Sequence, residues 1–573
     1  MDKQEIKETS IWQLYEIGEN FHRETGIYDD TDKNYRMYNG NQWAGAIFGD
    51  VEPIQKNFIK PTVKYKLSVI HANLYSIHFS SMNFEDPSFC EFAEKCCKML
   101  NRYAQRAWES DKMDKKGRKI TKDAAINDEG ILYVDFDKKR MLPINEVIPK
   151  NDIYYGDENN PEIQEQPYIL IRKRMPVSNA REWAFSKGVS TKDLDLILGD
   201  KENFESSGEA AKKEVDDKVT IIYKLYKKDG NVFFSAATRY CEIMKDKEIG
   251  VTLYPVAHMN WEEKEGSARG EGEVRSLIPN QIEVNRTEMR RVLTVKTQAY
   301  PHKIVDANRV ENPEALDHVG ATIKTNDKTV DDVRKVVGTL PPAQMSSDVR
   351  QLKEDLIRDT RELAGAGDIA TGQVNPELAS GKAVIAVQQS SQAPITEQKE
   401  GYKYFLEDVA KIWLEYLINY SEDGINLEEK VKDPKTGKEI VKLVKVSQEI
   451  LKKLQAVVKI DVTPKGAFDK IAQEMSVENL LVSGYFSQQK LGETEAYAEA
   501  LDDDSVSPKM KILEICRRRR EDLQKIARID AESKIARQKA NQYIQSDPNY
   551  QVEQIARALQ AKNSQKSVME NHN

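Results

Sequence analysis

The stretch ELASGKAV (377–384) contains the Gly-Lys pair of a phosphate-binding loop. Such a loop needs a first glycine five positions before the second, and a Ser or Thr after the lysine. The glycine-rich backbone cradles the phosphates, and the hydroxyl binds Mg²⁺. Here Pro376 and Ala383 occupy these two positions. The segment lacks both parts of a nucleotide site, so we expect no ATP to bind there.

The histidine, cysteine and acidic residues show no spacing typical of catalysis or of a metal site. The seven histidines are scattered, no CxxC, HExxH or GxSxG pattern occurs, and the five cysteines include the adjacent Cys96 and Cys97. The run Asp502-Asp503-Asp504 could bind a metal ion, but an acidic solvated loop is favoured, because one run rarely turns several ligands inward. We expect no catalytic residue, cofactor, metal or disulfide, and free thiols in a reducing compartment.

Charge and length limit the remaining possibilities. The chain has 573 residues, enough for several domains, and is 31% charged with a net charge of -8. This balance does not indicate a general nucleic-acid binder, so any contact with nucleic acid must be local. The run CRRRRED (516–522) could bind phosphate, but a charged helix face that pairs with local acids is favoured, since consecutive helical residues point in different directions.

No apolar run approaches the roughly 20 residues of a membrane span. The N-terminal MDKQEIKETS lacks the apolar stretch and cleavage site of a signal peptide. We therefore expect a soluble protein that is made in the cytosol and does not enter a membrane.

One segment differs from the rest of the sequence because it is nearly uncharged. Between Gly365 and Ala393 the only charged residues are Asp368, Glu377 and Lys382. Small and polar residues fill the remainder. Composition alone favours a flexible surface loop, so its position between the flanking elements decides how it is interpreted.

The first half of the chain predicts an α+β domain that ends near residue 265. Helices are expected at 61–80 and 87–110, and strands at 130–137 and 167–175. Asp229-Gly230, between two β-rich segments, predicts a tight hairpin. The glycine-rich GSARGEGE (266–273) then interrupts the pattern.

The next hundred residues predict two helices that enclose a small β-containing unit. The first helix ends near residue 300, with Pro279 as its first residue. The unit at 301–345 has strand-like segments at 302–306, 320–325 and 334–340. A returning helix has Ser347 as its N-cap, Gly365 as its stop and an apolar stripe at Val349, Leu352, Leu356 and Leu363. Together these elements predict a stalk.

The C-terminal part predicts further helices and a few strands. Residues 383–419 form one long helical stretch, and Pro394 is expected to kink it by removing a hydrogen bond. A hairpin is expected at 430–444 and a strand at 456–464, and these strands are expected to rejoin the first domain's sheet. The remainder, 466–573, reads as helical, with an acidic part followed by a basic part.

This order of parts resembles the portal proteins of tailed bacteriophages and related viruses. The elements that carry the resemblance are PNQIEVNRTEMRRVLTVKTQAY, the small unit, SSDVRQLKEDLIRDTREL, the loop AGAGDIATGQVNPELASGK and the long helix. The implied fold class is α+β, mainly helical. The implied parts are a wing (1–266), stem helix (267–300), clip (301–345), returning stem helix (346–364), tunnel loop (365–382), long kinked helix (383–419), C-terminal wing strands (420–465) and helical crown (466–573).

The resemblance implies a ring of about twelve subunits at one capsid vertex. Double-stranded DNA enters through the ring, driven by a separate terminase ATPase, and later leaves through it. The implied partners are other copies of the chain, the terminase, the major capsid and scaffolding proteins and a head-tail adaptor. The protein would belong to the virion and be synthesised in the host cytoplasm. It would not be an enzyme, in agreement with the missing phosphate loop.

The resemblance also gives the uncharged segment a physical meaning. A ring repeats each side chain around the channel, and every cation that neutralises a phosphate adds affinity. A loop with little net charge would let DNA slide. The residues expected to line the channel are Asp368, Thr371, Gln373, Asn375, Glu377, Ser380 and Lys382.

Two alternatives remain at this point. Another phage structural component, such as a head-tail adaptor or a scaffold, would be a shorter chain without the stalk. A DNA-packaging enzyme should carry a phosphate loop or a nuclease carboxylate cluster, and neither pattern is evident in the sequence.

Overall fold

The computed structural model contains two compact units, Met1–Thr463 and Pro464–Asn573. It describes residues 9–48, 53–81, 87–200, 218–299, 303–318, 320–326, 332, 336–340, 347–366, 393–432, 439–454, 456–464, 529, 531–539 and 560. In the second unit, residues 531–539 are helical, as expected. The remaining expectations for 466–573, including the acidic run at 502–504 and the basic run at 516–522, lie outside the described residues.

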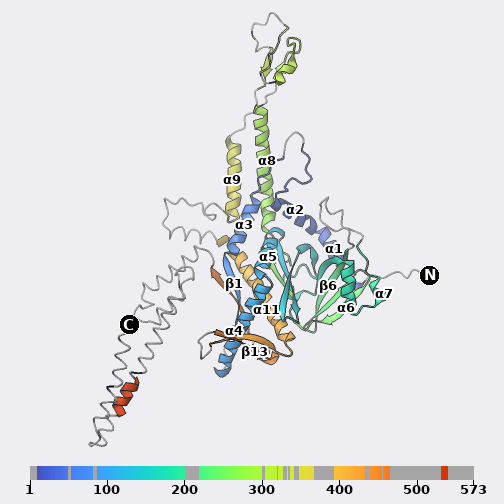
Figure 1. The fold of residues 1–573 in the computed structure, drawn as a ribbon. Coiled ribbons are helices and arrows are strands. Elements are labelled where there is room, and N and C mark those ends of the chain that lie inside the picture. The colour runs from blue at the N-terminus through green and yellow to red at the C-terminus, as the bar shows by residue number, and fades with distance from the viewer. Residues whose placement is uncertain are drawn as a thin grey trace, which may run out of the picture. The chain divides into compact units, whose positions relative to one another are not determined.

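The N-terminal region of the first unit contains the helices α1 (Ser10–Glu24), α2 (Ile27–Asn39), α3 (Ile59–Ile70), α4 (Pro87–Ser110) and α5 (Met113–Asn127) (Figure 1). The side chain of Thr9 caps α1 by accepting a hydrogen bond from the backbone N–H of Trp12 at 3.3 Å. Gly26 separates α1 from α2 and has φ of +73°, a left-handed conformation that glycine adopts without strain. The helix expected at 87–110 is confirmed as α4.

The helix expected at 61–80 is wrong in its second half. The helix α3 ends at Ile70, and the strand β1 (Asn73–Ser80) follows after a short turn. In β1 the buried positions Tyr75, Ile77 and Phe79 alternate with exposed ones, which is the period of a strand. Its partner is β14 (Val457–Pro464), which lies far along the sequence. This distant pairing overrides the local helical pattern.

Two antiparallel sheets form most of the β structure. The first has the order β3 (Leu142–Ile148), β2 (Glu129–Asp137), β9 (Val256–Asn260). The second has the order β4 (Ile153–Tyr155), β5 (Tyr168–Pro176), β6 (Lys218–Lys228), β7 (Asn231–Ala237), β8 (Glu242–Glu248). The strands expected at 130–137 and 167–175 are confirmed as β2 and β5. Asp229 and Gly230 join β6 to β7 with φ of +53° and +85°, as a type I′ turn requires.

The short helices α6 (Val177–Ser186) and α7 (Thr191–Leu194) follow β5. The long helix α11 (Thr396–Tyr420) packs against the three-stranded sheet, which α5 also contacts. Its Trp413 is fully buried and donates its indole N–H to the side-chain oxygen of Asn145 on β3 at 3.0 Å. The result is one large core in which residues far apart in the sequence meet.

The helices α8 (Glu273–Ala299) and α9 (Ser347–Leu363) lie side by side in Figure 1. They run antiparallel, because Asn280 contacts Thr360 whereas Glu288 contacts Lys353. Gly365 follows α9 with φ of +67°, which confirms it as the stop of the helix. The expected pair of helices is therefore present.

Between α8 and α9 lie β10 (Lys303–Val305), the 3-10 helix η4 (Pro313–Asp317) and β11 (Val337–Thr339). The strands β10 and β11 pair with each other, which agrees with strands at 302–306 and 334–340. The third expected strand, 320–325, makes a single bridge between Thr325 and Val310 in the part that the structure describes.

The sequence predicts Pro279 as the first residue of the helix, and this prediction is wrong, because Pro279 lies inside α8. The helix α8 begins six residues earlier, at Glu273. Proline cannot donate the hydrogen bond to residue 275. The buried side chains of Val274, Leu277 and Ile278 hold the preceding turn against the core, and Pro279 itself is exposed. Packing therefore outweighs the local cost.

Pro394 lies in the 3-10 helix η6 (Ala393–Ile395), immediately before α11 begins at Thr396. Within the described residues it precedes the α-helix and does not interrupt it. A proline is tolerated there because the first residues of a helix have no intrahelical acceptor. Residues 383–392 lie outside the described part, so a kink between two helical segments stays a prediction.

The last strands of the first unit only partly rejoin the sheet of the N-terminal region. The hairpin expected at 430–444 is confirmed as β12 (Ile425–Lys432) and β13 (Glu439–Val446), which pair only with each other among the described strands. The short helix α12 (Gln448–Leu454) follows. The strand expected at 456–464 is confirmed as β14, and its partner β1 does belong to the N-terminal region.

Candidate functional site: a helical hairpin and its buried base

A buried carboxylate joins the two helices of the α8–α9 hairpin. One carboxylate oxygen of Glu288 on α8 lies 3.1 Å from the ammonium nitrogen of Lys353 on α9. The other oxygen lies 2.9 Å from the ammonium nitrogen of Lys56. Burial alone would raise the pKa of Glu288, but hydrogen bonds from the two lysines hold that pKa below its usual value. Glu288 is therefore ionised at neutral pH and connects three segments of the chain.

A second set of buried polar groups fixes α8 against the segment that precedes α3. The side-chain oxygen of Gln281 accepts from the backbone N–H of Phe58 at 3.0 Å, and that of Asn285 accepts from the N–H of Lys56 at 2.9 Å. Gln281 also donates to the carbonyl of Lys56 at 2.7 Å. Because these amides are fully buried, a shift of α8 along its axis would leave them unpaired.

The first residue of α8 anchors the hairpin to the core. Glu273 forms a buried ion pair with Lys66 of α3 at 2.5 Å, and it accepts a hydrogen bond from the indole of Trp261 at 3.1 Å. A carboxylate in the first turn also interacts favourably with the positive end of the helix dipole. The start of α8 is thus fixed by both charge and hydrogen bonding.

Gly272, which precedes Glu273, is held by a second buried ion pair, between Asp128 and Lys150. The carboxylate of Asp128 accepts from the N–H of Gly272 at 2.7 Å and pairs with Lys150. A side chain at position 272 would place its Cβ 2.9 Å from the backbone nitrogen of Asp128. Only glycine fits this approach without displacing the backbone.

Arg269 forms the centre of the buried base. Its guanidinium contacts Glu158 through two hydrogen bonds of 2.8 and 2.9 Å, Glu129 at 2.5 Å and the ring of His22 at 2.8 Å. It also stacks over the ring of Tyr155, 4.9 Å from the centroid. The loop before α8 is therefore connected to α1, to β2 and to the loop after β4.

The charge states of this cluster follow from its burial. Burial would raise the pKa of Glu129, but Arg269 and His258 lower it to about 2. Burial and the adjacent Arg269 both lower the pKa of His22 to about 2, so that ring is neutral. Its Nε2 then accepts from Arg269, and the proton lies on Nδ1, which has no hydrogen-bond partner among the described atoms.

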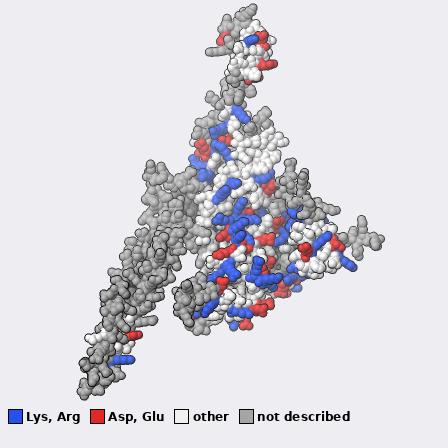
Figure 2. Space-filling model, in the orientation of Figure 1, with Lys and Arg blue, Asp and Glu red and all other residues white. Residues whose placement is uncertain are grey.

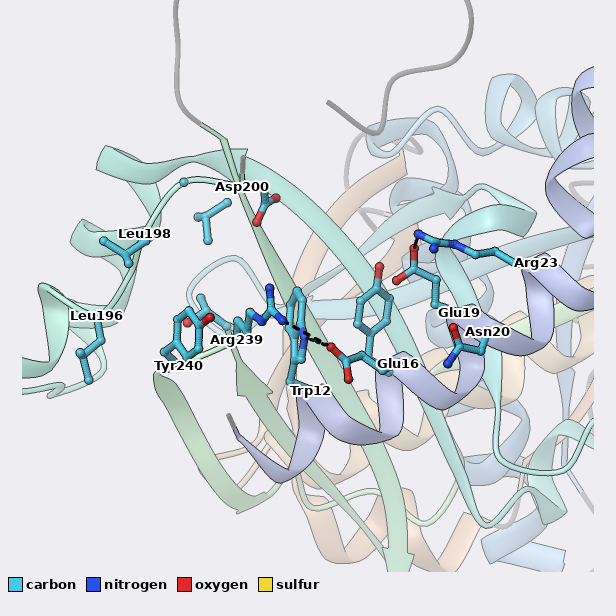
Figure 3. Close-up of a pocket in the computed structure, with 14 residues that line it drawn as sticks. Trp12, Glu16, Glu19, Asn20, Arg23, Leu196, Leu198, Asp200, Arg239 and Tyr240 are labelled. Atoms are coloured by element: carbon cyan, nitrogen blue, oxygen red, sulfur yellow. Dashed lines mark hydrogen bonds and ion pairs between the residues drawn. The ribbon is translucent and has the colours of Figure 1, made fainter. Parts of the chain in front are cut away.

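An open cleft of about 710 Å³ lies beside α1 (Figure 3). Figure 3 shows Arg239 next to the ring of Trp12, and Tyr240 lies on its other side, with centroids 5.8 and 5.5 Å from the guanidinium carbon. The charged side chains at the cleft have partners of opposite sign: Arg239 with Glu16, Arg23 with Glu19 and Arg174 with Asp200. This balanced lining does not favour a ligand of either charge, and we assign none.

Neither the hairpin nor the cleft has an arrangement typical of catalysis. Among the described side chains, no group of three or more His, Cys, Asp or Glu is placed to hold a metal ion. No described helix is long and apolar enough to cross a membrane. The arrangement is that of a protruding pair of helices held rigidly at its base.

A family model described as Phage P22-like portal protein matches residues 172–569, more than half of the chain. The chain belongs to the P22-like phage portal protein family. No curated protein matches it significantly. Portal proteins of phages are structural components of the virion capsid and not enzymes, and the family assembles with copies of itself. The mixed α+β fold, about half helical, agrees with this membership.

The expected channel-lining residues of this portal protein lie outside the described residues. They are Asp368, Thr371, Gln373, Asn375, Glu377, Ser380 and Lys382, all within the undescribed range 367–392. The described neighbours of that range are the end of α9, with Ala366, and η6, with Pro394. The structure therefore brings the two ends of the segment close together, since Gly365 approaches the Pro394 ring.

Sequence reasoning missed the buried base of the hairpin. It noted only that the glycine-rich GSARGEGE interrupts the preceding pattern. This stretch contains one signal of the buried base, which is the single arginine, Arg269, between Gly266 and Gly270. Nearby glycines leave room for such a side chain to approach other backbone segments. Its partners Glu129, Glu158 and His22 could not be identified in the same way, since they lie more than a hundred residues away.

Proposed function

We propose that this portal protein forms a ring of about twelve copies around a channel for double-stranded DNA. In this proposal the α8–α9 hairpin is the stem (267–300 and 346–364), residues 301–345 form the clip, and the wing comprises 1–266 and 420–465. The tunnel loop (365–382), long kinked helix (383–419) and crown (466–573) complete the subunit. The outer surface of the hairpin is the observation that carries the proposal.

The hairpin exposes apolar side chains that the described residues of the same chain leave uncovered. On α9, Leu352 is 58% exposed and Leu363 is 87% exposed. On α8, Leu293 and Val295 are also exposed. Large apolar residues gathered on a protruding element are typical of an interaction surface. Because the family self-assembles, the partner we propose is the hairpin of a neighbouring copy.

The outer faces of the two helices carry opposite charge. On α8 beyond residue 282, the inward-facing Glu288 is left out of the count. The remaining charged residues have a net charge of +3, from the basic Arg286, Arg290, Arg291 and Lys296 and the acidic Glu283. On α9 beyond residue 350, the inward-facing Lys353 is left out of the count. The remaining charged residues have a net charge of -2, from the acidic Glu354, Asp355, Asp359 and Glu362 and the basic Arg358 and Arg361. The face of α8 therefore complements the face of α9, which suits a head-to-tail contact that closes into a ring.

The register within the hairpin identifies the pair that should meet. Glu288 lies level with Lys353, so Arg286 lies level with Asp355. Rotational symmetry keeps neighbouring hairpins at the same height. Arg286 of one copy should thus face Asp355 of the next. Within one chain, Arg286 pairs with Glu283 at 3.8 Å and Asp355 pairs with Arg358 at 3.0 Å. Arg286 and Asp355 can keep these partners and also pair with each other across the interface.

Arg286→Asp is expected to weaken ring assembly, because it places like charges opposite each other in every interface. One surface pair contributes only about 0.2–1 kcal/mol, but the change is repeated at about twelve interfaces. The double variant Arg286→Asp with Asp355→Arg should restore assembly, since the pair is reversed. Native mass measurement at low salt reads out both. Equal losses in the single and the double variant would contradict this contact.

The channel itself is proposed to be lined by the tunnel loop, whose low charge lets DNA slide without being held. A separate terminase ATPase supplies the energy of packaging, in agreement with the missing phosphate loop in ELASGKAV. The same channel serves for ejection. The other proposed partners are the major capsid and scaffolding proteins and a head-tail adaptor. The ring lies at one capsid vertex and its subunits are synthesised in the host cytoplasm.

A further inference from the structure

Six basic residues form a continuous surface on α3 and α5, which we call the basic face. On α5, Lys115, Arg118, Lys119 and Lys122 recur at spacings of three and four and lie opposite the side that packs in the core. On α3, Lys60 and Lys64 are one turn apart. Figure 2 shows Lys and Arg gathered over this part of the molecule, where Figure 1 places α3 and α5.

The two helices meet at the ring of Tyr38. The ammonium group of Lys60 lies 5.7 Å from the ring centroid, and that of Lys122 lies 5.4 Å from it. Two cations over one ring link the α3 and α5 stripes into a single surface. The same two helices pack against α8, so the basic face lies beside the base of the hairpin.

Among the described residues, the basic face has more cations than nearby acids. None of its six side chains forms an ion pair with a described residue, although the protein forms many such pairs elsewhere. The acids on α5 have other partners: Asp114 accepts from the indole of Trp108, and Asp123 accepts from the hydroxyl of Tyr35. Burial raises the pKa of Asp123 above its usual value, while the hydrogen bond from Tyr35 and the charges of the nearby Lys119 and Lys122 act in the opposite direction. This one carboxylate does not balance the six cations of the basic face.

We propose that the basic face binds the phosphate backbone of double-stranded DNA outside the channel. The four basic residues of α5 extend over about 10 Å of helix, a length in which one DNA strand presents about three phosphates. Backbone binding of this kind depends on charge and not on base sequence. The basic face would hold DNA, whereas the proposed tunnel loop would let it slide.

Nucleic acid fits this surface better than an acidic protein. Protein interfaces are enriched in aromatic and apolar residues at their centre. No large apolar side chain is exposed on α3 or α5, both of which the structure describes in full. A surface made mainly of cations matches the charged, regular backbone of a nucleic acid.

Closed circular DNA gives a direct test, because it has no end that could enter the channel of a ring. The full chain is mixed with closed circular duplex at several salt concentrations, and the affinity is measured. The variant Lys115→Gln, Arg118→Gln, Lys119→Gln, Lys122→Gln removes four cations from the basic face. Each phosphate contact contributes about 0.9 to the slope of log affinity against log salt, so the loss of about three contacts should make the slope shallower by about three units.

The matched control removes four exposed lysines elsewhere: Lys187→Gln, Lys192→Gln, Lys245→Gln, Lys247→Gln. It changes the net charge equally and should leave the slope within about one unit of wild type. Native mass is measured for all three proteins, so that a defect in ring assembly is distinguished from a defect in DNA binding. Equal slopes in the two variants would overturn the proposal. So would wild-type DNA binding by the α5 variant combined with its loss from capsids, which would indicate an acidic protein partner.

Discussion

Arg269→Met is expected to lower the free energy of unfolding by about 3–5 kcal/mol, because it leaves the buried Glu129 and the partly buried Glu158 without their cation. Methionine fills a similar volume but supplies no positive charge. Urea unfolding followed by tryptophan fluorescence measures the change. Trp261 is a suitable reporter since it is buried in the loop that leads to Arg269.

Exposed arginines provide the control for this prediction. Arg140→Met removes a guanidinium that is 80% exposed and pairs loosely with Asp137, so stability should change by no more than about 0.5 kcal/mol. A loss of less than about 1 kcal/mol in Arg269→Met would show that the buried base does not anchor α8.

The same variant should change the acid sensitivity of the protein. In the wild type the folded pKa of Glu129 is about 2, below its ordinary 4.5. Its ionised form therefore stabilises the fold above pH 4.5, and this contribution is lost as the pH falls toward 2. Without Arg269 the folded pKa of Glu129 rises, so Arg269→Met should lose less additional stability over that interval. Stability curves between pH 6 and 2 measure the difference.

Changing both Asp368 and Glu377 to Lys is expected to slow or stop DNA packaging. The change replaces two negative charges by two positive ones, so it raises the net charge by four units per subunit, about 48 in a ring of about twelve, at the proposed channel lining. DNA would then be held by phosphate contacts that weaken with salt, so packaging should partly recover as the salt concentration rises. The DNA content of heads filled at several salt concentrations measures the effect.

A neutral double variant controls for changes in loop shape. Gln373→Ser with Asn375→Ser alters the side chains without changing charge, and packaging should remain near the wild-type rate. Ring assembly should be normal in both variants if 365–382 form the proposed surface loop, because substitutions in such a loop usually cost little stability. If the double-lysine variant fills heads at the wild-type rate at every salt concentration, the proposal that 365–382 line the channel is wrong.

Local signals in the sequence were sufficient for much of the fold. Helical periodicity predicted α4, and the positive φ preference of Asp229-Gly230 predicted the β6–β7 turn. The two helices of the hairpin and the stop at Gly365 also follow from patterns within about twenty residues. These features depend on near neighbours, which a sequence displays directly.

Features that depend on distant partners could not be predicted. Residues 73–80 have a helix-compatible composition, but β14 pairs with them as β1. Pro279 marks a helix start by local rules, whereas buried Val274 and Leu277 extend α8 past it. The partners of Arg269 come from α1, β2 and the loop after β4, and no short-range pattern connects these segments.

The candidate site likewise has features that the sequence predicted and features that required the three-dimensional structure. The resemblance in the order of elements was enough to identify a portal protein, and the family match confirms that prediction. The ionic contacts that fix α8, such as Glu288 between Lys56 and Lys353, required the three-dimensional arrangement. The seven expected channel residues stay predictions, since the structure does not describe 367–392.

The mass of the native particle tests the central claim most directly. A ring of about twelve copies of the 65.5 kDa chain should have a mass of about 790 kDa. A ring made without its capsid can contain one copy more or fewer, and this would still agree with the proposal. A monodisperse monomer of 65.5 kDa that persists at high protein concentration, across salt concentrations and in the presence of the capsid protein, would contradict it.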